Sequence, residues 1–283
     1  PIESNITSFN TSNWSPLGIG LYRDPKRNNS LLMFNINRRN KETQRAEVDI
    51  FSFKNDYSTL VHEKRFHHPE FTSPNDITPI SATEFYVTND HNTHRPLLAM
   101  LQDAFKIPNS NIIYCNIETD TCRPVVEPSN YYNGIRMSRD GKQVYATLTM
   151  PNSRVLIFER NSKTNDLIPV EELKIPCRLD NIDIDDHNNL WVACHPSPGQ
   201  FMIAAADKNY QRRSPSEIWK ITPRKQACPR SPQPTYSSKH WCAEMMFSSY
   251  NISMASVAAA FKEHILVGQI AGPELFHCFP KDL

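Results

Sequence analysis

The chain repeats one unit, in which two short segments of alternating hydrophobic and polar positions are separated by a polar turn. Each copy starts at a polar residue that ends a loop, and its second segment is more apolar than its first. Alternation with a period of two predicts half-buried β-strands rather than helices. The four copies pair residues 75–80 with 85–88, 133–137 with 144–148, 180–184 with 190–193, and 255–258 with 265–267.

Further strands are expected outside the four copies, and one helix is expected over residues 95–105. With 22 Pro and only 7 Gly, the turns must be made largely by Asn, Asp and Pro. Residues 196–250 are irregular and rich in Pro, Ser, Lys and Arg, and we interpret them as one blade that carries a long insertion. The additional strands are predicted at residues 17–22, 31–36, 46–53, 61–68, 112–115 and 155–158.

The spacing of the copies predicts a β-propeller. The leading Asn recurs at positions 75, 133 and 181, and propeller blades of four strands have periods of about 40 to 50 residues. We therefore predict an all-β fold, a six-bladed β-propeller that occupies residues 1–283 as one domain. Counting from residue 17 gives about five blades, so the opening N-terminal portion is expected to be missing from this chain.

The inner strands of a propeller begin at one end of a central channel, and the polar residues that lead the copies would meet there. Their side chains offer amide and carboxylate oxygens, which are the ligands that calcium prefers. The sequence therefore predicts a central calcium site. The residues that would surround it are Asn75, Asp76, Asn133, Asp180 and Asn181.

The overall composition is that of an ordinary globular protein, with 39% hydrophobic and 22% charged residues. A net charge of +1 gives no electrostatic reason to expect nucleic acid or an anionic membrane as a partner. No apolar stretch approaches the roughly 18 residues that a membrane-spanning helix needs. The pattern Gly-x-Ser-x-Gly and Gly-rich phosphate loops are also absent, which argues against a serine hydrolase or a nucleotide-binding protein.

The seven cysteines are an odd number, so at least one of them lies outside any set of pairs within the chain. Cys115 and Cys122 flank a short hairpin, and Cys228 and Cys242 bracket a Pro-rich loop, so a disulfide is plausible in each case. Cys177 and Cys194 flank the third copy and either pair or remain buried thiols. Cys278 is left over, which indicates a partner outside this chain.

Five Asn-x-Ser/Thr sequons, four of them within the first 30 residues, favour a secreted glycoprotein together with the disulfide candidates. The chain begins at Pro1 without a signal sequence, as expected of a processed segment. The sequon asparagines are Asn5, Asn10, Asn13, Asn28 and Asn251.

Four motifs in the copies resemble the paraoxonase/arylesterase family of calcium-dependent six-bladed propeller lactonases, which is related to gluconolactonase-type and strictosidine-synthase-like propellers. The resemblance extends in order from residue 16 to residue 279, broken mainly at 92–132 and 197–250. The matching stretches are 74–77 with 84–91, 133–135 with 138–145, 180–182 with 190–196, and 255–257 through 268.

The resemblance implies a catalytic calcium held by Asn75, Asn133, Asp180 and Asn181. It implies a second, structural calcium held by Asp76 and the backbone carbonyl of Ile19. Two further acidic ligands of the family come from an N-terminal segment that this chain does not contain. In the family a C-terminal cysteine is bonded near the N-terminus, so the resemblance implies that Cys278 is disulfide-linked to a separate chain carrying that segment.

The histidine pair of the family is absent here, because Leu17 and Ile36 stand at the two positions. The resemblance therefore implies a calcium-dependent hydrolase for a small lactone or ester, in which Asp180 is the base and aryl esters are poor substrates. His91 and His195 match family positions near the channel and are further catalytic candidates, although lone histidines are more often structural.

Two other functions remain open. The apolar residues at positions 17 and 36 also suit a non-hydrolytic biosynthetic catalyst, of the pericyclase or cyclase type, that binds an apolar natural product in the channel. Alternatively, the protein is a binding or scaffold protein with a purely structural calcium.

Overall fold

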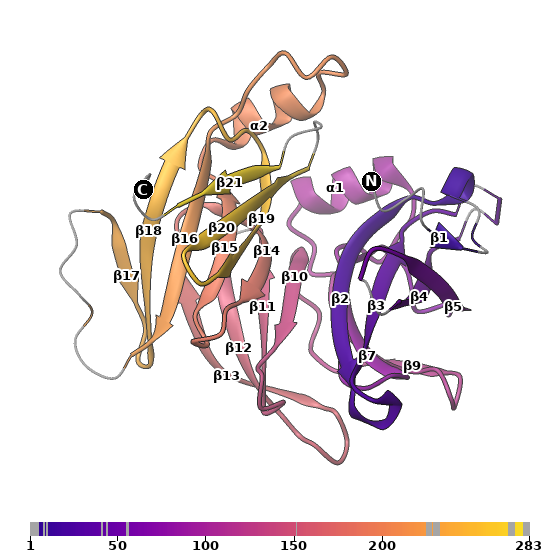
Figure 1. The fold of residues 1–283 in the computed structure, drawn as a ribbon. Helices are drawn as coiled ribbons and strands as arrows, with labels where there is room; N and C mark the ends of the chain where they lie inside the picture. Colours follow the sequence, from indigo (N-terminus) through magenta and orange to yellow (C-terminus); the bar gives the residue numbers. More distant parts are fainter. Residues whose placement is uncertain are drawn as a thin grey trace. The chain divides into compact units, whose positions relative to one another are not determined.

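The computed structural model describes residues 6–7, 9, 11–40, 42–43, 45–54, 57–150, 152–224, 228, 233–270 and 275–279, and these form an all-β fold of the β-propeller class (Figure 1). The strands form five sheets, of five, four, four, five and three strands. The four copies of the sequence unit are the hairpins β6–β7, β10–β11, β14–β15 and β19–β20, which confirms the predicted strand pattern.

In spatial order the first sheet is β1 (Ile6–Thr7), β5 (Leu60–Phe66), β4 (Glu47–Phe53), β3 (Ser30–Asn37) and β2 (Pro16–Asp24). The second is β6 (Pro74–Pro79), β7 (Glu84–Asn89), β8 (Asn111–Asn116) and β9 (Thr121–Pro124). The third is β10 (Tyr132–Met137), β11 (Gln143–Leu148), β12 (Arg154–Arg160) and β13 (Leu167–Lys174). The fourth is β14 (Arg178–Ile184), β15 (Leu190–His195), β16 (Ser216–Pro223), β18 (Trp241–Ser249) and β17 (Thr235–Ser237). The fifth is β19 (Ala255–Phe261), β20 (His264–Gln269) and β21 (Phe276–Cys278).

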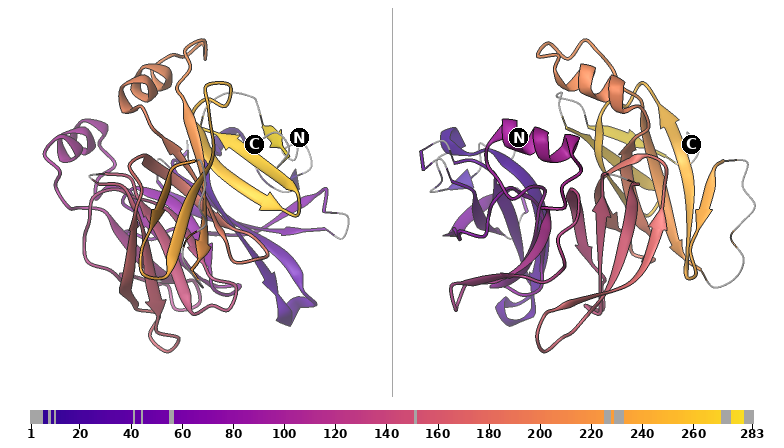
Figure 2. Two further views of the ribbon diagram at one scale, coloured as in Figure 1. Left: turned by 90° about the vertical axis from the view of Figure 1, so that its left-hand side faces the viewer. Right: turned by 180° about the vertical axis from the view of Figure 1, so that it is seen from behind.

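The prediction of six blades is wrong, since the described residues form five sheets. A sixth blade would need strands from the ends of the chain. Instead, β1 pairs in parallel with β5 and so extends the first sheet, while the fifth sheet has only three strands. The irregular stretch after residue 196 makes no blade of its own, because β16, β17 and β18 join the hairpin β14–β15; β16 and β18 lie side by side in Figure 2.

In the described part of the chain, two α-helices and two short 3₁₀ helices lie in the connections. Helix α1 (Pro96–Ala104) confirms the helix expected over residues 95–105, and α2 (Pro198–Ala205) connects β15 to β16. The 3₁₀ helices are η2 (Thr11–Asn13) and η3 (Pro25–Arg27). Among the described residues, no helix has both the length and the apolar character that crossing a membrane requires.

The chain divides into two compact units, and each is described by itself. Unit 1 comprises Pro1–Met137 and Asn161–Leu167, and unit 2 comprises Ser138–Arg160 and Ile168–Leu283. In unit 1 alternate residues of β3, among them Phe34 and Ile36, pack with Phe85 and Val87 of β7 in one hydrophobic core. The period of two predicted from the sequence thus creates this core.

The core of unit 2 is built around Trp219 and Ile221 of β16 and Val192 of β15. It also contains the disulfide Cys177–Cys194, one of the two arrangements that the sequence left open for these residues. The disulfides Cys115–Cys122 and Cys228–Cys242 are confirmed, and Cys278 takes part in none of the three.

Strand β2 passes unusually close to the backbone of β6 in unit 1, and glycine makes this approach possible. A Cβ atom on Gly18 would lie 2.5 Å from both the carbonyl oxygen of Asn75 and the Cα of Asp76. A Cβ atom on Gly20 would lie 2.5 Å from the ring of Pro79. Side chains at these two positions would therefore push β2 away from the strand that carries Asn75 and Asp76.

We expect Gly18→Ala to lower the free energy of unfolding by about 2 to 3 kcal/mol, because backbone atoms cannot move aside as a flexible side chain would. Gly199→Ala is the matched control, since a Cβ atom there meets nothing within 4 Å. Chemical denaturation of the two variants gives the comparison. Equal stability of Gly18→Ala and the wild type would contradict the close packing of β2 on β6.

Candidate active site

The residues predicted to bind metal or to catalyse lie at or next to strand ends. Asn75 and Asp76 are the second and third residues of β6, Asn133 is the second residue of β10, and Asp180 and Asn181 lie near the start of β14. Unit 1 contains Ile19, Asn75, Asp76, His91 and Asn133, and unit 2 contains Asp180, Asn181 and His195.

Asp90 is the centre of the group in unit 1, and the sequence analysis did not single it out. Its fully buried carboxylate accepts hydrogen bonds from Arg38 at 2.7 Å, Ser73 at 2.5 Å and Asn75 at 3.1 Å. Burial alone would raise the pKa of Asp90, but the hydrogen bonds, with His91 foremost, and the Arg38 charge hold it below its usual value. Asp90 is therefore an anion that fixes its neighbours. The feature of the sequence that could have pointed to Asp90 is its position directly before the candidate His91.

His91 is buried between two carboxylates. Its Nδ1 lies 2.9 Å from Asp90 and its Nε2 lies 3.0 Å from Asp103 of α1. Burial acts to lower the pKa of His91, but the hydrogen bonds to Asp103 and Asp90 and their charges outweigh it and raise this pKa to about 9. At neutral pH the ring is an imidazolium that donates from both nitrogens, so it is poorly suited to accept a proton.

The raised pKa of His91 makes stability depend on pH. The unperturbed value is 6.5, so this contribution is complete below pH 6.5 and is lost as the pH rises toward 9. We expect a loss of about 1 to 2 kcal/mol over that range after allowance for solvent screening. Unfolding measured at pH 6.5 and at pH 9 should show this loss in the wild type and a smaller one in His91→Gln. An equal dependence on pH in both proteins would show that His91 is not the titrating group.

Asp76 is held by protein groups in unit 1. Its Oδ2 accepts a hydrogen bond from the backbone N–H of Ile135 at 2.9 Å and lies 3.4 Å from Nη1 of Arg136. The same Nη1 donates to the carbonyl oxygens of Ile77 at 3.2 Å and Ile135 at 3.0 Å. A guanidinium group thus sits among a carboxylate and two carbonyl oxygens, as a bound cation would.

Thr88 of β7 joins the starts of two neighbouring strands. Its hydroxyl donates to the carbonyl oxygen of Asn133 at 2.6 Å and accepts from the backbone N–H of Asp76 at 3.0 Å. A β-branched residue suits the interior of a strand, and here its hydroxyl also links β6 to β10, which belong to two different sheets. The position of Asn133, which is buried, depends on this bridge.

In unit 2, Asp180 and His195 form a buried pair. Nε2 of His195 lies 3.2 Å from Oδ2 of Asp180, and the residues are 3% and 7% exposed respectively. The His195 ring packs on Phe201 of α2 with ring centroids 4.2 Å apart. The buried Nδ1 of His195 has no hydrogen-bond partner among the described residues. The His195 ring is therefore held by packing on Phe201, while its Nδ1 is left without a hydrogen bond within the described part of the chain.

The surroundings of the pair fix it further. The hydroxyl of Thr147 donates to the carbonyl oxygen of Asp180 at 2.6 Å. The disulfide Cys177–Cys194 joins the residue just before β14 to the residue that precedes His195. These contacts restrain the backbone on both sides of the pair.

Whether these side chains suit calcium depends on which of their atoms already form hydrogen bonds within the protein. The amide nitrogen of Asn75 is bound by Asp90, and that of Asn181 donates to Ser256 at 2.8 Å. In both side chains the oxygen is therefore the atom left for another partner, as a hard cation requires. In unit 2 the oxygens of Asp180 and Asn181 are of the kind that calcium binds, and in unit 1 so is that of Asn75, whereas the carboxylate of Asp76 is already compensated by Arg136.

The positions that lack the histidine pair differ in their surroundings. Leu17 is 43% exposed, whereas Ile36 is fully buried in the core of unit 1. Only Leu17 is thus available to line a ligand site. An imidazole at position 36 would enter the hydrophobic core.

In each unit a buried carboxylate near a strand end is thus paired with a histidine, Asp90 with His91 and Asp180 with His195. A family model described as Arylesterase matches residues 3–278. The chain belongs to the arylesterase family.

The relatives agree with this assignment. The chain is 31% identical over 194 residues to serum paraoxonase/arylesterase 1 of Mus musculus, covering 68% of this chain and 51% of that protein. It is 29% identical over 190 residues to serum paraoxonase/arylesterase 2 of Gallus gallus, covering 67% and 51%. The chain thus spans about half the length of the relatives it matches. A solved gluconolactonase from Xanthomonas campestris is 10% identical, with a TM-score of 0.47 over 94% of this chain and 85% of that one.

Proposed function

We propose that the protein is a calcium-dependent hydrolase that opens small lactones or cleaves esters. The observation that carries this proposal is the buried pair of Asp180 and His195, whose histidine is fixed against Phe201 and whose carboxylate neighbours Asn181. Membership of the arylesterase family and the names of the relatives support the same reaction class.

Asp180 and Asn181 of unit 2 would hold the calcium ion, which when bound would polarise the carbonyl group of the substrate and stabilise the developing oxyanion. Asp180 would accept the proton of the attacking water, and His195 would orient the Asp180 carboxylate. In unit 1 Asp90 would hold the amide nitrogen of Asn75 and leave its oxygen for another partner. We assign His91 the role of a charged support for Asp90 rather than that of a base.

We propose one calcium ion instead of two. The second site, expected at Asp76 and the backbone carbonyl of Ile19, would bring a divalent cation close to the guanidinium of Arg136, and like charges at such distances repel strongly. In this protein Arg136 would do the work of that second ion.

Secretion is part of the proposal, supported by three disulfides and by serum relatives. Of the five sequons, Asn28 and Asn251 are exposed and Asn13 is partly buried, while Asn5 and Asn10 lie outside the described residues. A second polypeptide linked through Cys278 has no support from the structure or the relatives and is not included.

Hydrolysis of phenyl acetate and of δ-lactones, measured with calcium and after chelation, tests the function. We expect lactone turnover that stops on chelation and returns when calcium is added, with slow turnover of the aryl ester. Lactone turnover that persists after exhaustive chelation would contradict calcium dependence. Absence of turnover with calcium bound would favour the non-hydrolytic biosynthetic alternative.

A further inference from the structure

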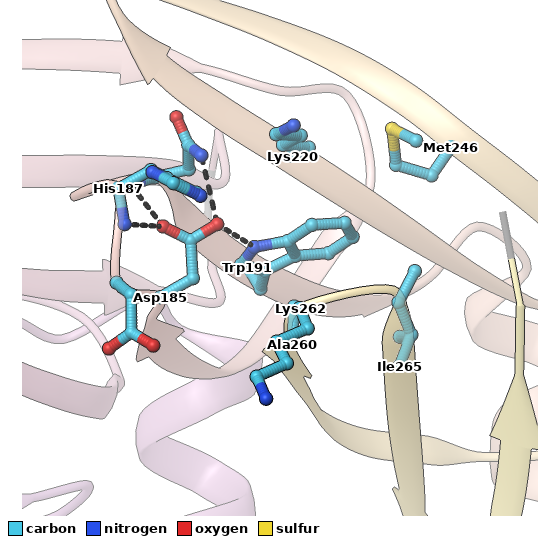
Figure 3. A pocket seen from close by; sticks show the side chains of 10 residues that line it. Asp185, His187, Trp191, Lys220, Met246, Ala260, Lys262 and Ile265 are labelled. Atoms are coloured by element: carbon cyan, nitrogen blue, oxygen red, sulfur yellow. Dashed lines mark hydrogen bonds between the residues drawn. The ribbon is translucent and has the colours of Figure 1, made fainter.

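Unit 2 contains a cavity of about 430 Å³ that lies away from the candidate active site (Figure 3). It is bordered by the turn from β14 to β15 and by residues of β16, β18 and the β19–β20 hairpin. Asp180 lies near the start of β14, whereas Asp185 follows its last residue. The two residues are five steps apart along the strand, which corresponds to about 17 Å. The cavity is therefore at the opposite end of this strand from the pair of Asp180 and His195.

The floor of the cavity is apolar. Trp191 and Ile265 are 4% and 3% exposed, so they are fixed parts of the fold, and Met246 and Ala260 complete the surface. Ligand cavities of roughly 300 to 1,000 Å³ with a mainly apolar lining and a few charged groups are typical of small-molecule sites. This cavity lies in that size range and combines four apolar with six polar or charged residues, so it suits a small ligand that has both an apolar body and a charged group.

The acidic groups at the cavity are already used by the protein. Asp185 accepts hydrogen bonds from the indole N–H of Trp191 at 2.9 Å and from both the backbone and the side chain of Asn189. Asp186 is paired with Arg139 at 2.6 Å. Both carboxylates therefore already have protein partners, although the donors to Asp185 are neutral and leave its negative charge in place.

The two lysines that border the cavity, in contrast, have no recorded carboxylate partner in the described part of the chain. Nζ of Lys220 lies 5.6 Å from the centre of the Trp191 ring, and Nζ of Lys262 lies 5.3 Å from that of Phe261. Glu244 is opposite Lys220 in the pairing of β16 with β18, yet the two make no ion pair. In Figure 3 the two lysines lie on opposite sides of the Trp191 indole.

We propose that this cavity binds a small organic carboxylate with an apolar body. The aliphatic or aromatic part would lie against Trp191, Met246 and Ile265, and the carboxylate would pair with either Lys220 or Lys262. The preference for a carboxylate depends on the lysine charges as well as on the apolar surface. An apolar surface alone would bind neutral molecules equally well. This site does not depend on the proposed hydrolase function.

Octanoate is a suitable probe, with octanol and octylammonium as neutral and cationic counterparts of the same length. We expect isothermal titration calorimetry to detect octanoate binding to the wild-type protein at submillimolar to millimolar concentration, with octanol at least 10-fold weaker and octylammonium undetectable. The double variant Lys220→Met/Lys262→Met should bind octanoate at least 10-fold more weakly. Methionine keeps most of the side-chain length and removes the charge.

Lys174→Met is the control, because it removes one positive charge from an exposed lysine of β13 that pairs with Glu172. It should leave the affinity for octanoate unchanged. Equal octanoate affinity of the double variant and the wild type would overturn the proposal, and so would equal affinity for octanoate and octanol. Failure of the wild-type protein to bind octanoate at 10 mM would also overturn it.

Discussion

Replacing Asp180 by Asn is expected to lower kcat for lactone hydrolysis by about 10²- to 10⁴-fold, which is the range for loss of a positioned general base. Asn has nearly the same shape as Asp and can still accept a hydrogen bond from His195, so the fold should survive. What is lost is the ability to take a proton and one negative charge at the calcium site. Turnover of a δ-lactone at saturating calcium is the measurement, and calcium content of the purified variant is the second.

Asp183→Asn is the matched control, since Asp183 lies on the same strand, β14, three residues further along. It should retain nearly full turnover. If Asp180→Asn keeps wild-type kcat with calcium bound, the base must be another residue. If turnover and calcium are lost together and high calcium restores both, the role of Asp180 is that of a ligand alone.

Replacing Arg136 by Met is expected to lower the free energy of unfolding by about 3 kcal/mol. Asp76 is almost fully buried, and removing one partner of a buried ion pair leaves an uncompensated charge. The double variant Asp76→Asn/Arg136→Met should recover most of this loss, because it removes both charges together. Chemical denaturation of the two single variants and the double variant gives the coupling energy.

Arg139→Met is a suitable control for Arg136→Met. Arg139 is three residues away and pairs with Asp186, but both side chains are about half exposed, so the loss should be below about 1 kcal/mol. The purified wild-type protein should contain one calcium ion per chain by elemental analysis. Two ions per chain, or an Arg136→Met variant as stable as the wild type, would show that Arg136 does not replace a metal.

The strand pattern was accessible from the sequence because it is local. Alternating positions and polar turns located all four repeated hairpins, and the helical period of residues 95–105 located α1. The number of sheets was not accessible in the same way. The number of sheets depends on which strand the terminal segments pair with. Residues 6 and 7 carry no sequence pattern that predicts their parallel pairing with β5.

The candidate site was predictable only in part, for a related reason. Residue types at strand starts pointed to Asn75, Asn133 and Asp180, but the partners that decide their chemistry come from other elements. Asp103 reaches His91 from α1 and changes a possible base into a charged donor. Arg136 contacts Asp76 although the two residues are 60 positions apart in the sequence. The sequence alone does not distinguish a buried, paired arginine of this kind from one exposed to solvent.

The three disulfides have a consequence for how the chain matures. Each disulfide joins two cysteines that have no other cysteine between them in the sequence. The sequence separations are 7, 17 and 14 residues. During synthesis in an oxidising compartment, every native partner therefore arrives before the first cysteine of the following pair. Correct pairing can proceed in the order of translation, and rearrangement by a disulfide isomerase should contribute little to the yield of native protein.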